Sequence, residues 1–225
     1  MNPAEISSRL RRSPIHGSRE SSVKADAGPA SFLGQARHRP TSGVTMTDRS
    51  LRRRFGVKGP AAEAWLAERG FPIPLGANRW TVGGDALVGR LATSEFLIES
   101  LAEDEPRVIL AAEQLAAASR PAQVFPVVRQ DLVVSLKGPA LSDLLRQICG
   151  VNFTPHLREP DSASGTLVLT SMIGVGAVAV PRLEADGVDL TLWLDPSFAN
   201  YFWTTLTALI SDLEGGEPLE QPNRT

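Results

Sequence analysis

Few side chains in this sequence are of the types that carry catalysis or hold a metal ion. The chain has three histidines, His16, His38 and His156, and a single cysteine, Cys149. Nucleophilic catalysis needs a thiol or hydroxyl beside a base, and Zn²⁺ sites need several His or Cys ligands at short spacing. A Cys149–His156 pair is conceivable, but an expected helix end and a loop separate the two residues. We therefore expect no catalytic, cofactor-binding or metal-ligating residue in this chain.

A glycine-rich stretch and two lysines are weaker candidates for binding sites. The stretch Ile173 to Ala177 lacks the third glycine and the following helix of a dinucleotide-binding loop, so we expect a strand whose glycines allow close packing. Lys58 and Lys137 each precede Gly-Pro, where they would meet an anionic ligand. Lysines at a strand end need no ligand, however, and we expect these two to be simply solvated.

Tryptophans mark a candidate interface. Trp80, Trp193 and Trp203 are of a residue type that is enriched at protein–protein interfaces. In the segment from Val188 to Leu194 the leucines share one face of an expected strand, and Trp193 faces the other way. Trp193 is therefore the best candidate of the three.

Composition and charge exclude several classes of protein. The 225 residues are 42% hydrophobic, and no apolar run approaches the roughly 18–20 residues that a membrane helix needs. One cysteine suits a reducing compartment, so we expect a cytoplasmic protein. Residues 1–54 hold 11 Lys and Arg against 4 Asp and Glu, whereas residues 55–225 hold 12 against 21. The acidic balance of the larger part argues against a nucleic-acid surface there.

The sequence repeats one phrase. Lys58-Gly59-Pro60-Ala61 recurs as Lys137-Gly138-Pro139-Ala140, and an interval of 79 residues separates both Lys58 from Lys137 and Leu66 from Leu145. An alternating apolar run precedes each copy and an amphipathic run follows it, which predicts strand, tight turn and helix twice. The fold class expected from this pattern is α+β, with two related β-α-β-β-type halves.

Apolar periodicity and turn signals predict the other elements. In the first half we expect strands at 54–58, 80–82, 86–91 and 95–99 and helices at 61–69 and 106–119. In the second half we expect an extended run at 124–137, a helix at 140–148, one or two strands in 166–182 and a strand at 188–194. Asp195-Pro196 is a strong helix start. The apolar face of that helix is expected to bury seven side chains: Phe198, Tyr201, Phe202, Leu206, Leu209, Ile210 and Leu213.

These elements predict three regions. Residues 1–46 have no sustained apolar period, and we interpret them as disordered or as a mis-assigned extension. A basic arm for nucleic acid or membrane and a transit peptide are alternatives, but Glu5, Glu20 and Asp26 suit a transit peptide poorly; we favour translation from Met46. Residues 47–213 form the folded domain, with halves at about 51–120 and 124–213, and residues 214–225 form a flexible tail.

Several motifs in this order resemble the gamma subunit of heterotetrameric sarcosine oxidase and its relatives. The first half matches at Arg54-Phe55, Lys58 to Ala61, Asn78-Arg79-Trp80, Arg90-Leu91 and Glu95-Phe96-Leu97. The second half matches at 129–155 and 190–206, so the resemblance covers residues 50 to about 213. Ala61 and Ala140 stand where the family motif often has a second glycine.

The resemblance implies a fold and a function. The family shares the fold of the folate-binding aminomethyltransferase, the T-protein of glycine cleavage. Its complexes oxidise the N-methyl group of sarcosine or a related amine, carry FAD, FMN and NAD, and pass the one-carbon unit to tetrahydrofolate. By resemblance this chain is a non-catalytic gamma subunit that binds no cofactor alone and has alpha, beta and delta subunits as partners. N-methylglutamate dehydrogenase has a homologous subunit, so the substrate stays open. A stand-alone folate-binding or aminomethyltransferase-like protein and an unrelated scaffold domain are the alternatives.

Overall fold

The computed structural model describes residues 13–15, 37–38, 43–102, 105–117, 121–158 and 161–215. Most of the expected extension 1–46 and residues 216–225 of the expected tail lie outside these ranges. Within them, no helix is both long enough and apolar enough to cross a membrane.

In the described ranges the strands form two sheets, A and B, in which every pairing is antiparallel. Sheet A has the order β1 (Arg37–His38), β2 (Thr45–Asp48), β8 (Leu132–Lys137), β12 (Gly187–Leu194), β11 (Val175–Glu184) and β10 (Val168–Met172). Sheet B has the order β7 (Phe125–Val127), β3 (Arg54–Lys58), β6 (Glu95–Ser100), β5 (Ala86–Ala92), β4 (Arg79–Gly83) and β9 (Ser164–Thr166).

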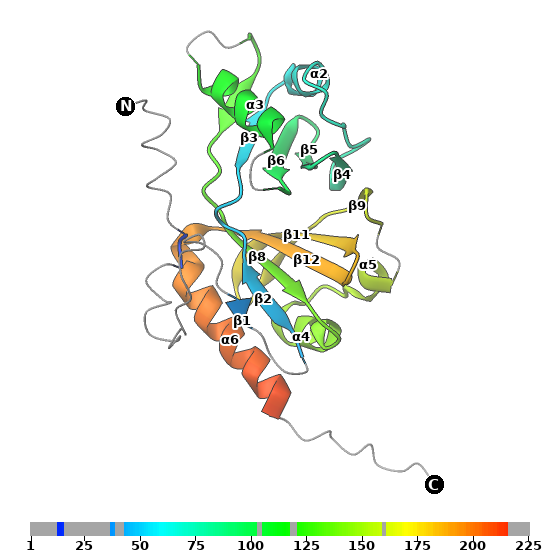
Figure 1. Cartoon of the computed structure of the whole chain (residues 1–225), viewed down its shortest axis with the longest axis vertical. Helices are drawn as coiled ribbons and strands as arrows, with labels where there is room; N and C mark the ends of the chain where they lie inside the picture. The colour runs from blue at the N-terminus through cyan, green and yellow to red at the C-terminus, as the bar shows by residue number, and fades with distance from the viewer. Residues whose placement is uncertain are drawn as a thin grey trace.

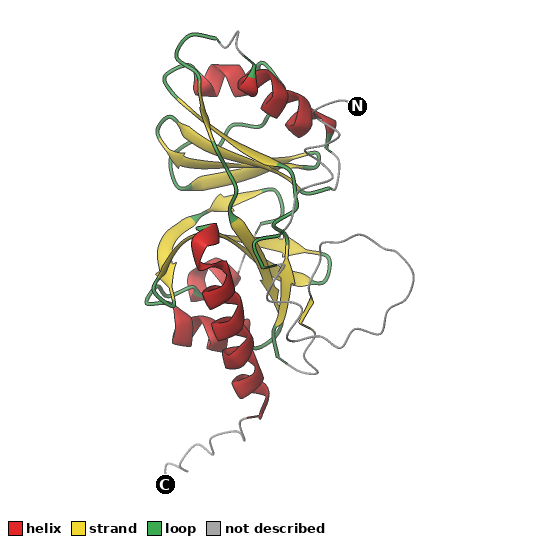
Figure 2. Ribbon diagram, turned by 90° about the vertical axis from the view of Figure 1, so that its left-hand side faces the viewer, coloured by secondary structure: helices red, strands yellow, loops and turns green. Residues whose placement is uncertain are grey.

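The helices cover the outer faces of the sheets, which gives four layers (Figure 2). Helices α2 (Ala62–Ala67) and α3 (Pro106–Ala116) pack on sheet B, and α4 (Leu141–Ile148) and α6 (Ala199–Gly215) pack on sheet A (Figure 1). A short helix, α5 (Thr154–Arg158), follows α4, and a 3-10 turn, η2 (Pro196–Phe198), precedes α6. The molecule is therefore α+β, as the sequence predicts.

Each sheet has its own helix-facing core, and a third core joins the two sheets. Alternation along β12 puts Leu190, Leu192 and Leu194 into the core beneath α4 and α6, while Trp193 faces sheet B. The core between the sheets consists of Trp80, Leu87, Leu97, Val133, Leu167, Val180 and Trp193. The interface in which Trp80 and Trp193 take part is therefore internal to this chain, and the expectation that Trp193 marks a contact with another protein is wrong. Trp203 is also buried, in the core of sheet A.

The repeated phrase forms the same structure twice. β3 and β8 each end at the lysine, and Gly59 and Gly138 then adopt φ values of 123° and 139°. Only glycine takes such angles readily. A Cβ at either glycine would lie 2.2 Å from a carbonyl oxygen, that of Gln123 for Gly59 and that of Gly43 for Gly138. The helix that follows begins at Ala62 in one copy and Leu141 in the other.

The two halves exchange a strand. β2 precedes β3 in the chain but pairs with β8, where Thr45 lies opposite Lys137. β7 precedes β8 but pairs with β3, where Phe125 lies opposite Lys58. Each exchanged strand therefore lies beside the strand that ends in Lys-Gly-Pro in the other half's sheet. The connecting segments, 49–53 and 128–131, cross between the sheets.

The strand exchange changes the boundaries expected from sequence. Thr45 and Met46 belong to β2, so the expected boundary between residues 46 and 47 falls inside a strand. Met46 is fully buried, and Ile15 and Val44 from the expected extension lie in the same core. Residues on the N-terminal side of Met46 thus contribute to the packed structure of the second half.

The prediction that Phe198 and Tyr201 join the buried face of the last helix is wrong, because they expose 47% and 49% of their surfaces. Asp195 accepts a hydrogen bond from the Ser197 N–H, at 2.8 Å, and starts a 3-10 turn rather than the α-helix itself. The α-helical period begins only at Ala199. The residues that it does bury include Phe202, Leu206 and Ile210.

Candidate functional site

The imidazole and the thiol that the sequence offers contact different neighbours. Cys149 follows the last residue of α4, and its Sγ lies 3.3 Å from Thr170 Oγ1 in β10. The ring of His156 in α5 packs edge-on against the ring of Phe153, which precedes that helix. No group of three or more His, Cys, Asp or Glu side chains in the described residues is placed to hold a metal ion. Neither side chain belongs to the site described below.

The two repeated lysines differ in their surroundings. Lys58 is exposed, whereas Lys137 donates hydrogen bonds to the carboxylates of Glu184 and Asp186. Burial lowers the pKa of Lys137, but the hydrogen bonds to Asp186 and Glu184 outweigh it and hold that pKa above its ordinary value. Two carboxylates already neutralise this ammonium, so Lys137 is poorly suited to bind an anion.

The glycine-rich stretch forms a turn and the start of a strand. Ile173 and Gly174, at φ values of 43° and 79°, make the turn between β10 and β11. Gly176 follows in β11 and faces away from the core that holds Ala177. Close packing at Gly176 does not occur, because a Cβ there would meet no atom within 4 Å. The expected strand is confirmed only from Val175 onwards.

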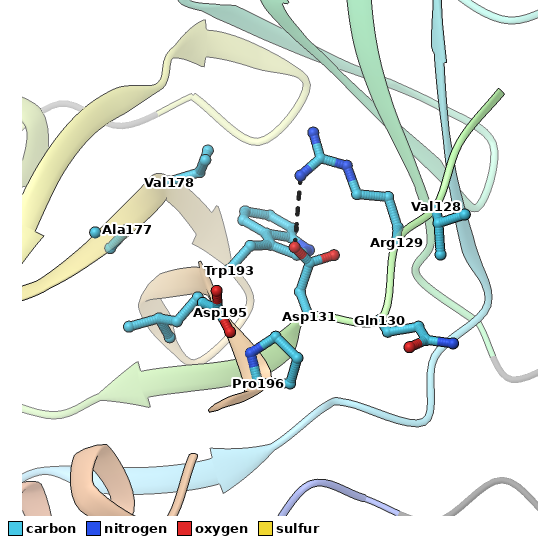
Figure 3. Close-up of a pocket in the computed structure, with 11 residues that line it drawn as sticks. Val128, Arg129, Gln130, Asp131, Ala177, Val178, Trp193, Asp195 and Pro196 are labelled. Carbon is cyan, nitrogen blue, oxygen red and sulfur yellow. Dashed lines mark hydrogen bonds and ion pairs between the residues drawn. The ribbon is translucent and has the colours of Figure 1, made fainter. Parts of the chain in front are cut away.

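The candidate site is a hollow of about 550 Å³ near the junction of the two halves. One wall is the crossing segment 128–131, and the opposite wall comes from the start of β11 and the end of β12 with η2 (Figure 3). The lining residues are Val128, Arg129, Gln130, Asp131, Gly176, Ala177, Val178, Trp193, Leu194, Asp195 and Pro196. None of these described residues has a thiol, hydroxyl or imidazole, and the ionisable or amide side chains of the lining are those of Arg129, Gln130, Asp131 and Asp195.

Charged groups of both signs border the hollow. Arg129 lies 3.5 Å from Asp131 Oδ1 and 3.6 Å from Glu95 Oε1, both long ion pairs. Asp131 Oδ2 and Arg129 Nε are buried without a hydrogen-bond partner in the described residues. Hydrogen bonds from the side chain and backbone N–H of Ser197 lower the pKa of the Asp195 carboxyl below its ordinary range. Asp195 is therefore a carboxylate at any pH near neutral.

A buried ion network fixes the wall of the hollow. The Glu99 carboxylate, with no exposed surface, accepts hydrogen bonds from Arg54 Nε at 3.0 Å and from Trp193 Nε1 at 2.6 Å. The Arg54 guanidinium also donates to the main-chain oxygens of Asp131 and Arg49 at 3.0 Å each. One arginine thereby holds both crossing segments, and Glu99 links it to the tryptophan that lines the hollow.

Sequence reasoning missed this site. Its residues come from segments that are far apart in the chain, and the crossing segment 128–131 was expected only to be part of the extended run at 124–137. One signal was present: Glu99 ends the strand expected at 95–99, and the residues before it, Phe96, Leu97 and Ile98, are all apolar. A carboxylate at the end of a fully buried strand needs a paired cation, and such pairs are structural or functional anchors.

Comparison with known proteins identifies the fold. No family model matches this chain, and no curated protein matches its sequence. Among solved structures, glycine cleavage system aminomethyltransferase T from Bartonella henselae is similar, with a TM-score of 0.59 and 16% sequence identity. The match covers 88% of this chain and 57% of that one.

At this level of identity the likeness defines the class of structure, a T-protein-like fold. The chain spans little more than half the length of the transferase that it matches.

Proposed function

We propose that this chain is the gamma subunit of a heterotetrameric sarcosine oxidase-like complex. In that role it is a structural subunit beside alpha, beta and delta subunits. The complex oxidatively demethylates sarcosine or a related N-methyl amino acid, with FAD, FMN and NAD, and transfers the one-carbon unit to tetrahydrofolate. In this role the chain is part of an oxidoreductase but is not itself the catalytic subunit.

One observation supports the proposal: the chain has a T-protein-like fold. The fold agrees with the family that residues 50 to about 213 resemble in sequence. The lining has carboxylates, a guanidinium and an amide, and the cysteine and histidine of the fold contact other neighbours. A subunit that leaves the flavin and one-carbon chemistry to its partners is expected to have such a site.

A pull-down of the tagged full-length chain from its native host tests this function. Mass spectrometry and an absorption spectrum of the eluate are the two measurements. We expect a large and a mid-sized flavoprotein subunit together with the visible absorption of flavin. A colourless eluate that contains this chain alone would contradict the proposal.

A stand-alone folate-binding protein is the second candidate. The hollow of about 550 Å³ favours it, because that volume lies within the usual range for small-molecule sites. This function predicts micromolar binding of tetrahydrofolate to the purified chain. Isothermal titration calorimetry measures it, and the absence of a binding heat would remove this candidate.

A further inference from the structure

The hollow continues into an apolar rim that no described residue covers. Val128 on the crossing segment exposes 81% of its surface, and Phe198 and Tyr201 follow the lining residue Pro196. The Tyr201 hydroxyl donates to the Ile173 carbonyl at 3.1 Å, which places this ring beside the turn that leads into the lining strand β11. We call Val128, Phe198 and Tyr201 the apolar rim.

Inside the rim, negative charge is in excess. Among the described residues, the lining holds the carboxylates of Asp131 and Asp195 and one guanidinium, that of Arg129, which already forms ion pairs with Asp131 and with Glu95 beside the hollow. Figure 3 shows Asp131 and Asp195 on the border of the same hollow. The Asp195 carboxylate accepts a hydrogen bond from the Ser197 N–H but forms no ion pair with a described residue, so a cation that enters the hollow would form a charge-assisted hydrogen bond with it.

We infer that this surface, the hollow with its apolar rim, docks a partner protein that inserts an arginine or lysine side chain between Asp131 and Asp195. The inference rests on the proposed function and names the part of the chain that contacts its complex. A small amine would neutralise the carboxylates but would leave the rim in water. A protein segment with apolar residues beside its cation covers both, and such anchored side chains dominate interface energetics.

Two changes test the surface without disturbing the fold. Gly176→Leu fills the hollow, because a side chain at Gly176 points into open space on the lining face of β11. The double variant Asp131→Asn with Asp195→Asn removes charge but keeps the oxygen acceptors and an N-cap residue. Matched controls are Gly150→Leu, where added atoms also meet nothing within 4 Å, and Asp143→Asn on the exposed face of α4. Thermal unfolding midpoints verify that all four proteins are folded.

The decisive measurement uses the complex itself. Each tagged full-length chain is purified from the native host, and quantitative mass spectrometry gives the amount of flavoprotein subunit per tagged chain. We expect at least tenfold less flavoprotein subunit with the double Asn variant and with Gly176→Leu, and wild-type amounts with both controls. Equal recovery for all variants would overturn the docking surface and leave the proposed function intact.

A second arm keeps the inference testable if the wild-type chain recovers no flavoprotein, which is the failure of the proposed function. The full chain is then titrated with N-acetyl-arginine amide and with the neutral analogue N-acetyl-citrulline amide, and ¹⁵N amide shifts are recorded. We expect saturable shifts at residues 128–131 and 193–196 for the cation alone, abolished in the double Asn variant. Equal responses to both probes, or none, would overturn the inference. If the wild-type chain does recover flavoprotein, binding of the arginine probe together with undiminished recovery in the variants would assign the hollow to a small cation and equally overturn the inference.

Discussion

The two halves of this molecule have the same plan but bury different parts of it. Apart from β1 and β9 at opposite ends, the strand orders of the two sheets match position by position, and the Lys-Gly-Pro turns superimpose in conformation. The donated strands differ: Met46 in β2 is fully buried, whereas Phe125 in β7 exposes 52% of its surface. The last helix has 11 residues in the first half and 17 in the second. Strand pairing and turn geometry are thus shared, whereas burial has diverged.

The buried carboxylates of the two central strands show the same divergence. Glu99 in β6 pairs with Arg54 across the strands, whereas Asp189 in β12 accepts hydrogen bonds from the hydroxyls of Ser135 and Thr191. One site therefore contains a compensated ion pair and the other a carboxylate that is bound by neutral groups.

The largest expected effect on stability comes from breaking the ion pair between Arg54 and Glu99. Glu99→Ala leaves the buried Arg54 guanidinium uncompensated, which costs about 3–5 kcal/mol of unfolding free energy. Asp189→Ala leaves only two neutral hydroxyls unpaired and costs about 1–3 kcal/mol. Urea denaturation of both variants measures the two values. A loss for Asp189→Ala as large as that for Glu99→Ala would contradict the contrast between the halves.

The next largest effect concerns the glycine turn that the two halves share. Gly59→Ala and Gly138→Ala each force a Cβ to within 2.2 Å of a carbonyl oxygen at positive φ, so both are expected to lose about 2 kcal/mol or more. Gly150→Ala is the control and changes stability by less than about 0.5 kcal/mol. Chemical denaturation curves decide this, and a neutral result at either Gly59 or Gly138 would mean that the two turns are not equivalent.

The donated strands should respond unequally. Met46→Ala removes a fully buried side chain and is expected to cost about 2–5 kcal/mol, whereas Phe125→Ala costs less than about 1 kcal/mol. Thermal and urea unfolding of the two variants provide the comparison. Similar losses for both would show that β7 is anchored as firmly as β2.

The smallest effect is a pH dependence confined to the second half. The lowered pKa of Glu184 means that its contribution is present above its ordinary value of 4.5 and is lost as the pH falls through the lower folded-state value. The raised pKa of Lys137 means that its contribution is present below 10.5 and is lost as the pH rises through the higher folded-state value. Lys137→Met should remove the alkaline slope, reduce the acid slope that the Arg182–Glu184 ion pair still maintains in part, and lower stability near neutral pH by less than about 1 kcal/mol.

Lys58→Met is the matched control for the pH experiment, because Lys58 occupies the repeat position of Lys137 and is exposed. Stability measured from pH 3 to pH 11 in this variant should follow the wild-type curve. If Lys58→Met also lost the pH dependence of stability, the assignment of that dependence to Lys137 and Glu184 in the second half would be wrong.

The alternation and spacing of apolar residues predicted many of the strands, helices and turns, because these elements depend mainly on residues that are close together in the sequence. Strand alternation separated Trp193 from Leu192, and the repeat located both turns at Gly59 and Gly138. The identity of the partner strand does not follow from local pattern: β2 lies only a short segment before β3 in the chain, yet it pairs with β8, and its Met46 lies in the core of sheet A. The hollow went unpredicted for the same reason, since it depends on where the crossing segment 128–131 meets β12.

The strand exchange determines when each sheet can finish folding during synthesis of the chain. β2 is among the first described strands to leave the ribosome, yet its partner β8 begins only at Leu132, so β2 waits for more than eighty residues of further synthesis. Neither half is therefore a separable folding unit, and a cut between residues 117 and 121 would leave each fragment with an unpaired strand edge. Such an edge attracts other chains as readily as its own partner, and two co-expressed fragments can regain solubility only by exchanging their strands with each other.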